Sequence, residues 1–89
     1  MDEANEKLNP DEMYETLEQS LKSSGHDFDL GRVRAAYDVA KMAHAGQKRK
    51  DGSDYVTHCV AAAQIAYEMG LDEDSVVAAL LHDTIEDTS

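Results

Sequence analysis

Signals that start and end helices constrain this chain more than any other feature of its sequence. Asn9 followed by Pro10 is typical of a helix start, because Asn caps the first turn and proline is pre-organised for the first helical position. Further caps are expected at Asp29, Thr57 and Asp72. Expected helix ends are Ser23-Ser24-Gly25, Gly46 and Gly70. No segment alternates apolar and polar residues for long enough to predict a strand, so the sequence predicts an all-α fold, a small bundle of about four helices.

Apolar residues recur at helical spacing in each segment and predict which faces lie inside. The stripe of the first segment consists of Met13, Leu17 and Leu21. That of the second consists of Val33, Ala36, Tyr37, Ala40, Ala43 and His44. In the third, the expected inward residues are His58, Ala61, Ala62, Ile65 and Met69. The fourth contributes Val76, Val77, Leu80 and Leu81.

Charge falls into three blocks along the 89 residues, with −7 in residues 1–29, +3 in residues 30–58 and −7 in residues 59–89. A chain with a net charge of −11 is not expected to bind nucleic acid, which requires a basic face. Its hydrophobic content of 42% excludes a disordered acidic tail. The single Cys, the acidic amino terminus and the lack of a long apolar run predict a cytoplasmic domain without a membrane partner.

The basic block contains a short polar segment between Gly46 and Gly52 in which residues 48–50 read Lys-Arg-Lys. Glycines allow close approach of a backbone to a ligand, and Arg and Lys bind phosphate, so this loop is a candidate anion site. The alternative is an ordinary solvated turn that pairs with the acids of residues 1–29. We interpret His44, just before the loop, as a packing or loop-anchoring residue.

The last helical segment places candidate metal ligands four residues apart on two adjacent faces: His82 with Glu86, and Asp83 with Asp87. His58 stands at the start of the preceding helix. Nitrogen and oxygen donors together suit Mn²⁺, Fe²⁺ or Zn²⁺ better than Ca²⁺. The alternatives are solvated surface residues in the last segment and, for His58, a core histidine that bonds to a backbone carbonyl.

Three linked motifs resemble the amino-terminal half of the HD hydrolase domain of RelA/SpoT homologues, which remove the 3′-pyrophosphate from guanosine tetra- and pentaphosphate. They are Ala-His-Ala-Gly-Gln-Lys-Arg-Lys-Asp-Gly at 43–52, Tyr-Val-Thr-His at 55–58 and Leu-Leu-His-Asp-Thr-Ile-Glu-Asp-Thr at 80–88. The resemblance implies a partial HD-domain fold. Residues 1–28 would be an acidic amino-terminal helix and linker, and residues 29–89 the amino-terminal portion of the hydrolase domain.

The resemblance also implies roles for individual residues. The implied ligands of a divalent ion, usually Mn²⁺, are His58, His82 and Asp83. Glu86 and Asp87 would position and activate the water that attacks the pyrophosphate. Arg49 would lie against the guanine ring and Lys50 near a phosphate. Together these residues predict metal-dependent hydrolysis, with guanosine tetraphosphate or pentaphosphate as the small-molecule partner.

This sequence departs from the family pattern in several places. Asp51 stands where Ser is usual, Ser53-Asp54 where Glu-Pro is common, and Cys59 where Pro commonly follows the ligand histidine. The family domain also continues beyond the matched motifs and carries a fourth ligand, an Asp, so we expect an incomplete fragment with weak metal binding and little turnover. The alternatives are a non-catalytic acidic helical interaction module that retains the HD motif, and another metal phosphohydrolase of the HD superfamily.

Overall fold

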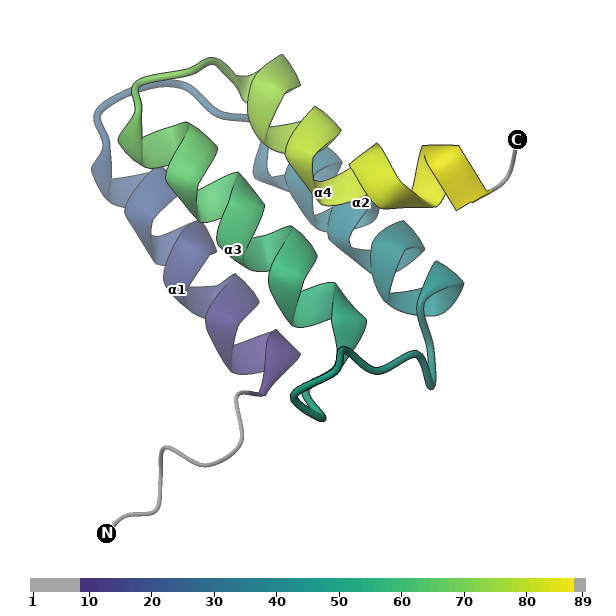
Figure 1. The fold of residues 1–89 in the computed structure, drawn as a ribbon. Coiled ribbons are helices and arrows are strands. Elements are labelled where there is room, and N and C mark those ends of the chain that lie inside the picture. Colours follow the sequence, from purple (N-terminus) through teal and green to yellow (C-terminus); the bar gives the residue numbers. More distant parts are fainter. Residues whose placement is uncertain (1–8, 88–89) are drawn as a thin grey trace, which may run out of the picture.

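Residues 9–87 form four helices joined by loops (Figure 1). A computed structural model describes the backbone of residues 9–87 and the side chains of residues 9–82. The helices are α1 (Pro10–Ser23), α2 (Leu30–Ala43), α3 (Tyr55–Glu68) and α4 (Glu73–Asp87). Within residues 9–87 there is no strand, only an isolated bridge between Lys48 and Asp54. The predicted all-α bundle is therefore confirmed.

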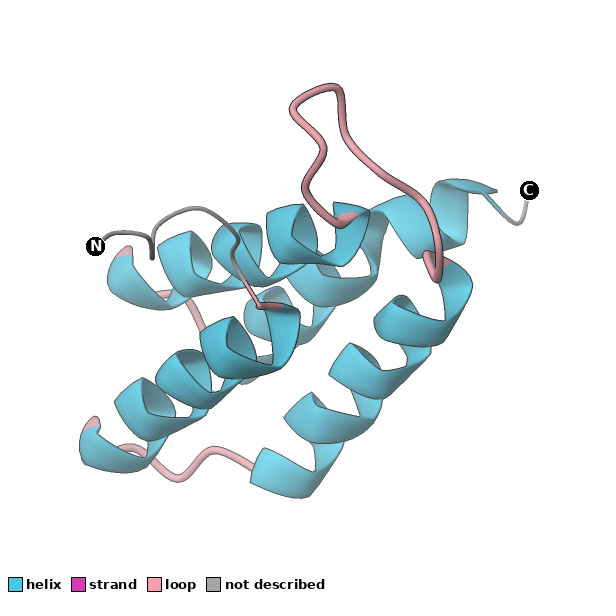
Figure 2. Cartoon of the chain, turned by 90° about the horizontal axis from the view of Figure 1, so that it is seen from below, coloured by secondary structure: helices cyan, strands magenta, loops and turns pink. Residues whose placement is uncertain are grey.

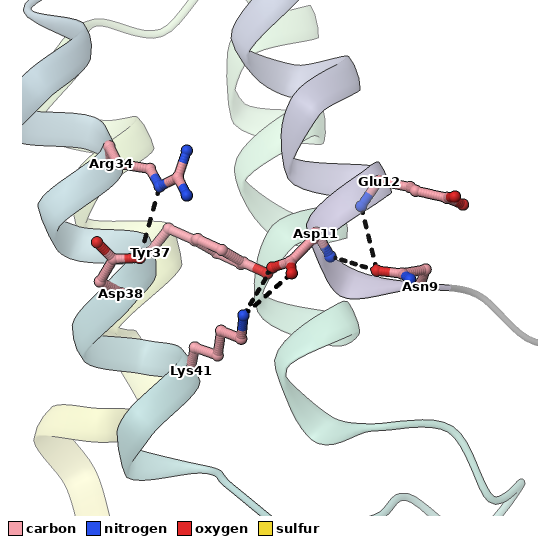
Figure 3. A network of polar contacts seen from close by, with 7 residues as sticks. All are labelled: Asn9, Asp11, Glu12, Arg34, Tyr37, Asp38 and Lys41. Atoms are coloured by element: carbon pink, nitrogen blue, oxygen red, sulfur yellow. Dashed lines mark hydrogen bonds and ion pairs between the residues drawn. The ribbon is translucent and has the colours of Figure 1, made fainter.

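Three of the predicted caps hold the helix starts. Oδ1 of Asn9 accepts hydrogen bonds from the backbone N–H groups of Asp11 and Glu12, at 2.8 and 3.3 Å (Figure 3). Asp29 and Asp72 cap α2 and α4 in the same way, each accepting from the N–H three residues later. These bonds satisfy N–H groups that have no partner within the helix.

The predicted cap of α3 at Thr57 is wrong, because the helix is already under way at that residue and begins at Tyr55. The cap position is Asp54, whose side chain makes no capping bond. Oγ1 of Thr57 instead donates to the carbonyl oxygen of Asp54 at 2.6 Å. The N–H of Tyr55 donates to the carbonyl oxygen of Gln47 at 2.9 Å, so closure of the preceding loop fixes the helix start.

The predicted inward face of α3 is also wrong in part. Ile65 and Met69 are 56% and 69% exposed. Buried residues of α3 are Val56, Thr57, Cys59, Val60, Ala63 and Ala66. Apolar residues occur on nearly every side of this helix, so periodicity alone could not select the buried side. His58 lies at the edge of the buried face and is half-buried.

The core lies between all four helices. Stacked rings of Tyr14 and Tyr37, with centroids 4.5 Å apart, join α1 to α2. In α4, Val76 and Leu80 are fully buried, as predicted. Figure 1 shows α1 and α3 side by side, and α4 packs mainly against α3 and α2. Within residues 9–87, no helix has the length and apolar character needed to cross a membrane.

Polar contacts also join α1 to α2 (Figure 3). The Tyr37 hydroxyl donates to Oδ1 of Asp11 at 2.6 Å, and Nζ of Lys41 donates to the same oxygen at 2.8 Å. The hydrogen bond from Lys41, followed by that from Tyr37, lowers the pKa of Asp11. Burial, together with the bond to Asp11, raises the pKa of Tyr37. The carboxylate therefore stays charged at neutral pH and holds the amino end of α1 against α2.

Candidate functional site

The loop between α2 and α3 extends away from the helices (Figure 2). The bond between Tyr55 and Gln47 closes its base. Within it, the N–H of Arg49 donates to the carbonyl oxygen of Ser53 at 2.8 Å, and that of Gly52 donates to the carbonyl oxygen of Arg49 at 2.9 Å. Gly52 has a φ of 90°, a conformation that only glycine adopts readily. The loop is thus a small hairpin with a defined backbone.

Two acids, Asp51 and Asp54, follow the three consecutive bases of this loop. Nζ of Lys48 forms an ion pair with Oδ1 of Asp54 across the hairpin. Oδ1 of Asp51 accepts from Oγ and from the backbone N–H of Ser53, at 2.7 and 2.9 Å. These bonds lower the pKa of Asp51, so its carboxylate opposes an anionic ligand at neutral pH. Attraction for an anion therefore depends on the two bases that follow Lys48.

An open pocket of about 650 Å³ lies against this loop. Its lining residues are Lys48, Arg49, Lys50, Asp51, Tyr55 and His58. The guanidinium carbon of Arg49 lies 5.8 Å from the centroid of the Tyr55 ring, within cation–π range. Arg49, Lys50 and His58, which belong to two separate sequence motifs, thus line one pocket.

Helices α3 and α4 bring the two predicted ligand histidines together. Centroids of the His58 and His82 rings are 5.7 Å apart, with an angle of 61° between the ring planes. The Tyr55 ring contacts His58 edge-on at 5.6 Å. The imidazole pair therefore adjoins the pocket that the basic loop forms.

The orientation of His82 is fixed by its own helix. Nδ1 of His82 lies 2.7 Å from the carbonyl oxygen of Ala79. Because a carbonyl oxygen only accepts, Nδ1 carries the hydrogen, and in the neutral ring Nε2 carries the lone pair. A backbone carbonyl bound to one ring nitrogen is the usual arrangement of a histidine that ligates metal through the other.

The remaining predicted site residues lie at the carboxyl end of α4. Asp83, Glu86 and Asp87 belong to this helix, but their side chains lie outside the described residues. Among the side chains of residues 9–82, no group of three or more His, Cys, Asp or Glu is placed to hold a metal ion. The complete ligand set and the catalytic acids therefore stay predictions.

Two further aromatic residues, His44 and Tyr55, support this arrangement, and only the first has a role that the sequence predicts. His44 is 3% exposed, and its Nδ1 lies 2.8 Å from Oε1 of Gln47, which confirms its expected anchoring of the loop. Tyr55 was not singled out as a site residue, although it stands three residues before His58. That spacing places both rings on one face of a helix and is the signal that could have identified Tyr55.

Comparisons with known proteins show the family to which this chain belongs. A family model described as the HD domain matches residues 36–89. SpoT of Escherichia coli K12, named a bifunctional (p)ppGpp synthase/hydrolase, is 47% identical over 76 residues, which cover 85% of this chain and 11% of SpoT. A protein of Aquifex aeolicus named guanosine-3′,5′-bis(diphosphate) 3′-pyrophosphohydrolase is 40% identical over 82 residues, covering 92% of this chain and 12% of that relative.

RelA of Mycobacterium tuberculosis, also named a bifunctional (p)ppGpp synthase/hydrolase, is 52% identical over 60 residues, or 67% of this chain and 8% of RelA. The chain belongs to the HD domain family. The resemblance to RelA/SpoT homologues inferred from the three motifs is confirmed. The chain spans about a tenth of the length of these relatives.

Proposed function

We propose that this chain supplies part of a site that hydrolyses the 3′-pyrophosphate of guanosine tetra- or pentaphosphate. The observation that carries the proposal is the pocket that Arg49, Lys50 and His58 line together, with His82 beside His58. It joins a basic loop suited to phosphate with a pair of imidazoles suited to a divalent ion. Residues 29–89 would form the amino-terminal portion of the hydrolase domain, preceded by residues 1–28.

The residues fit a divalent metal ion. The His58 and His82 rings are near enough to share an ion bound about 2.1 Å from each ring nitrogen. The bond from His82 to the Ala79 carbonyl leaves Nε2 as the donor to metal. His58, His82 and Asp83 would hold Mn²⁺. When bound, such an ion lowers the pKa of water and stabilises charge on a phosphoryl oxygen.

The other residues would bind the substrate and manage the proton. Arg49 would lie against the guanine ring, which a planar guanidinium can stack upon, and Lys50 would contact a phosphate as a point charge. Glu86 and Asp87 would orient the attacking water, and one of them would accept its proton.

Binding of guanosine tetraphosphate tests the proposal on the 89-residue protein. With Mn²⁺ present, calorimetry is expected to show that the protein binds guanosine tetraphosphate at least about tenfold more tightly than guanosine diphosphate. Only guanosine tetraphosphate carries the 3′-pyrophosphate. Arg49→Ala should weaken the binding of both nucleotides, because both carry the guanine ring that Arg49 would contact. The matched control is Arg34→Ala, because Arg34 is also an exposed arginine but lies on α2 away from the pocket.

Equal affinity for the two nucleotides, with no dependence on Mn²⁺, would contradict the proposal. That result would favour the non-catalytic interaction module. The hydrolytic step can be followed in the same mixtures, and any pyrophosphate release should require Mn²⁺ and disappear in His82→Ala.

A further inference from the structure

We propose that His44 is a positioning residue, which fixes the basic loop relative to the His58–His82 pair through Gln47 and Tyr55. The consequence for ligand binding rests on the proposed function, whereas the effect on the loop can be measured without any ligand. His44 is the residue that follows α2 and has two contacts with the loop and its far end.

The first contact runs from His44 to Gln47. The imidazole is 3% exposed, and its Nδ1 lies at hydrogen-bonding distance, 2.8 Å, from Oε1 of Gln47. The carbonyl oxygen of Gln47 in turn accepts from the N–H of Tyr55, at 2.9 Å. The N–H of Gln47 also donates to the carbonyl oxygen of His44, at 2.9 Å. Gln47 is therefore held to the end of α2 by its side chain and its N–H, and to the start of α3 by its carbonyl oxygen.

The second contact runs through the Tyr55 ring. His44 stacks on this ring with centroids 4.9 Å apart and 29° between the planes. The same ring contacts Arg49 at 5.8 Å and His58 at 5.6 Å. The side chains of His44, Arg49 and His58 thus contact one aromatic ring, and His44 is the buried one of the three. A shift of Tyr55 would change the distance from Arg49 to His58.

Hydrogen bonds within the hairpin and the Lys48–Asp54 ion pair define the shape of the loop, but they do not fix its position relative to the helices. Its side chains from Gln47 to Gly52 are exposed, and its regular pairing is a single bridge between Lys48 and Asp54. A segment with few buried contacts samples open conformations readily. Ligand affinity falls in proportion to the fraction of molecules in the competent conformation, so loss of the anchor should weaken anion binding.

Two variants test the anchor separately. His44→Phe keeps a ring against Tyr55 but removes the nitrogen that bonds to Gln47. Gln47→Met removes the side-chain oxygen at the other end of this contact. Because Gln47 is exposed, this variant should fold even if His44→Phe, which changes a buried side chain, does not. The matched control is His26→Phe, because His26 is exposed in the loop between α1 and α2.

The readout is ¹⁵N relaxation of the backbone amides of residues 48–53. In both variants we expect order parameters to fall from about 0.85 to below about 0.6, while amides of the four helices keep their values. The control should leave the loop unchanged. Ordered loop amides in both variants would overturn the proposal, as would an equal loss of order in loop and helices.

A second measurement separates positioning from general damage. The affinity for inorganic pyrophosphate should fall by about tenfold in each variant. It should fall no further in the double variant, because the two substitutions remove the same contact. Mn²⁺ affinity should stay within about twofold, since the imidazole pair lies on α3 and α4. An equal loss of both affinities would contradict a role in the loop. If the unmodified protein binds neither probe, the proposed function fails, and the order parameters still decide the role of His44.

Discussion

At the scale of single residues, Tyr14 carries a buried polar group that costs stability. Its hydroxyl has no hydrogen-bond partner among the described residues, and the side chain is 1% exposed. Burial raises the pKa of this phenol to about 12. A buried hydroxyl without a partner costs about 1–3 kcal/mol, whereas the stacked ring contributes to the core.

Tyr14→Phe is therefore expected to raise the free energy of unfolding at pH 7 by about 1 kcal/mol, measured by urea denaturation. The control is Tyr37→Phe, which should lower stability because its hydroxyl donates to Asp11. Above the ordinary phenol pKa of 10.0, the unfolded chain loses the Tyr14 proton first, so stability should fall as pH rises towards 12. The Tyr14→Phe variant should lose less stability over this pH range. A lower stability of this variant than of the unmodified protein at pH 7 would contradict the account.

The same scale shows which site residues a sequence can reveal. Lys48 to Lys50 stand out because they are consecutive bases in an acidic chain, and His58 and His82 stand out because each lies in one of the linked motifs. The contact between His44 and Tyr55 could not be predicted, because it joins the two ends of a loop whose path depends on tertiary packing. Identity and spacing indicate chemistry, whereas ring-to-ring contacts across helices require coordinates.

At the scale of elements, the ion pair of Asp11 with Lys41 links the first turn of α1 to the last turn of α2. In the folded protein the pKa of Asp11 lies below its ordinary value of 3.8. The charged carboxylate therefore stabilises the fold at pH values above 3.8. This contribution should be lost as pH falls through the lower, folded value, because protonation ends the ion pair.

Asp11→Asn is expected to destabilise the protein by about 1 kcal/mol at pH 7, allowing for the exposure of the pair to solvent. The difference from the unmodified protein should shrink as pH falls below 3.8. Denaturation at several pH values checks this, with Glu15→Gln as a control at an exposed position of the same helix. A difference independent of pH would show that the charge of Asp11 is not the cause.

Elements also differ in how well sequence specifies them. The starts of α1, α2 and α4 were predictable because each has a side chain that caps its first turn. The start of α3 was not, because a loop hydrogen bond rather than a side chain sets it. The buried face of α3 could not be predicted either, because this helix has apolar residues on most of its sides.

At the scale of the whole molecule, helix content and family could be predicted from sequence, but the packing of the helices could not. Which helices adjoin one another depends on the shapes of their buried faces, here α4 against α3 and α2. That packing places His82 beside His58 and both beside the basic loop. The central claim is that these two imidazoles share one divalent ion.

The most direct test is a titration of the 89-residue protein with Mn²⁺, followed through the imidazole NMR signals of its four histidines. Paramagnetic broadening should affect His58 and His82 together at the same low Mn²⁺ concentration, while His26, exposed between α1 and α2, serves as the internal reference. Simultaneous loss of the His58 and His82 signals is the predicted result. Broadening of only one of them, or of His26 to the same extent, would contradict a shared metal site.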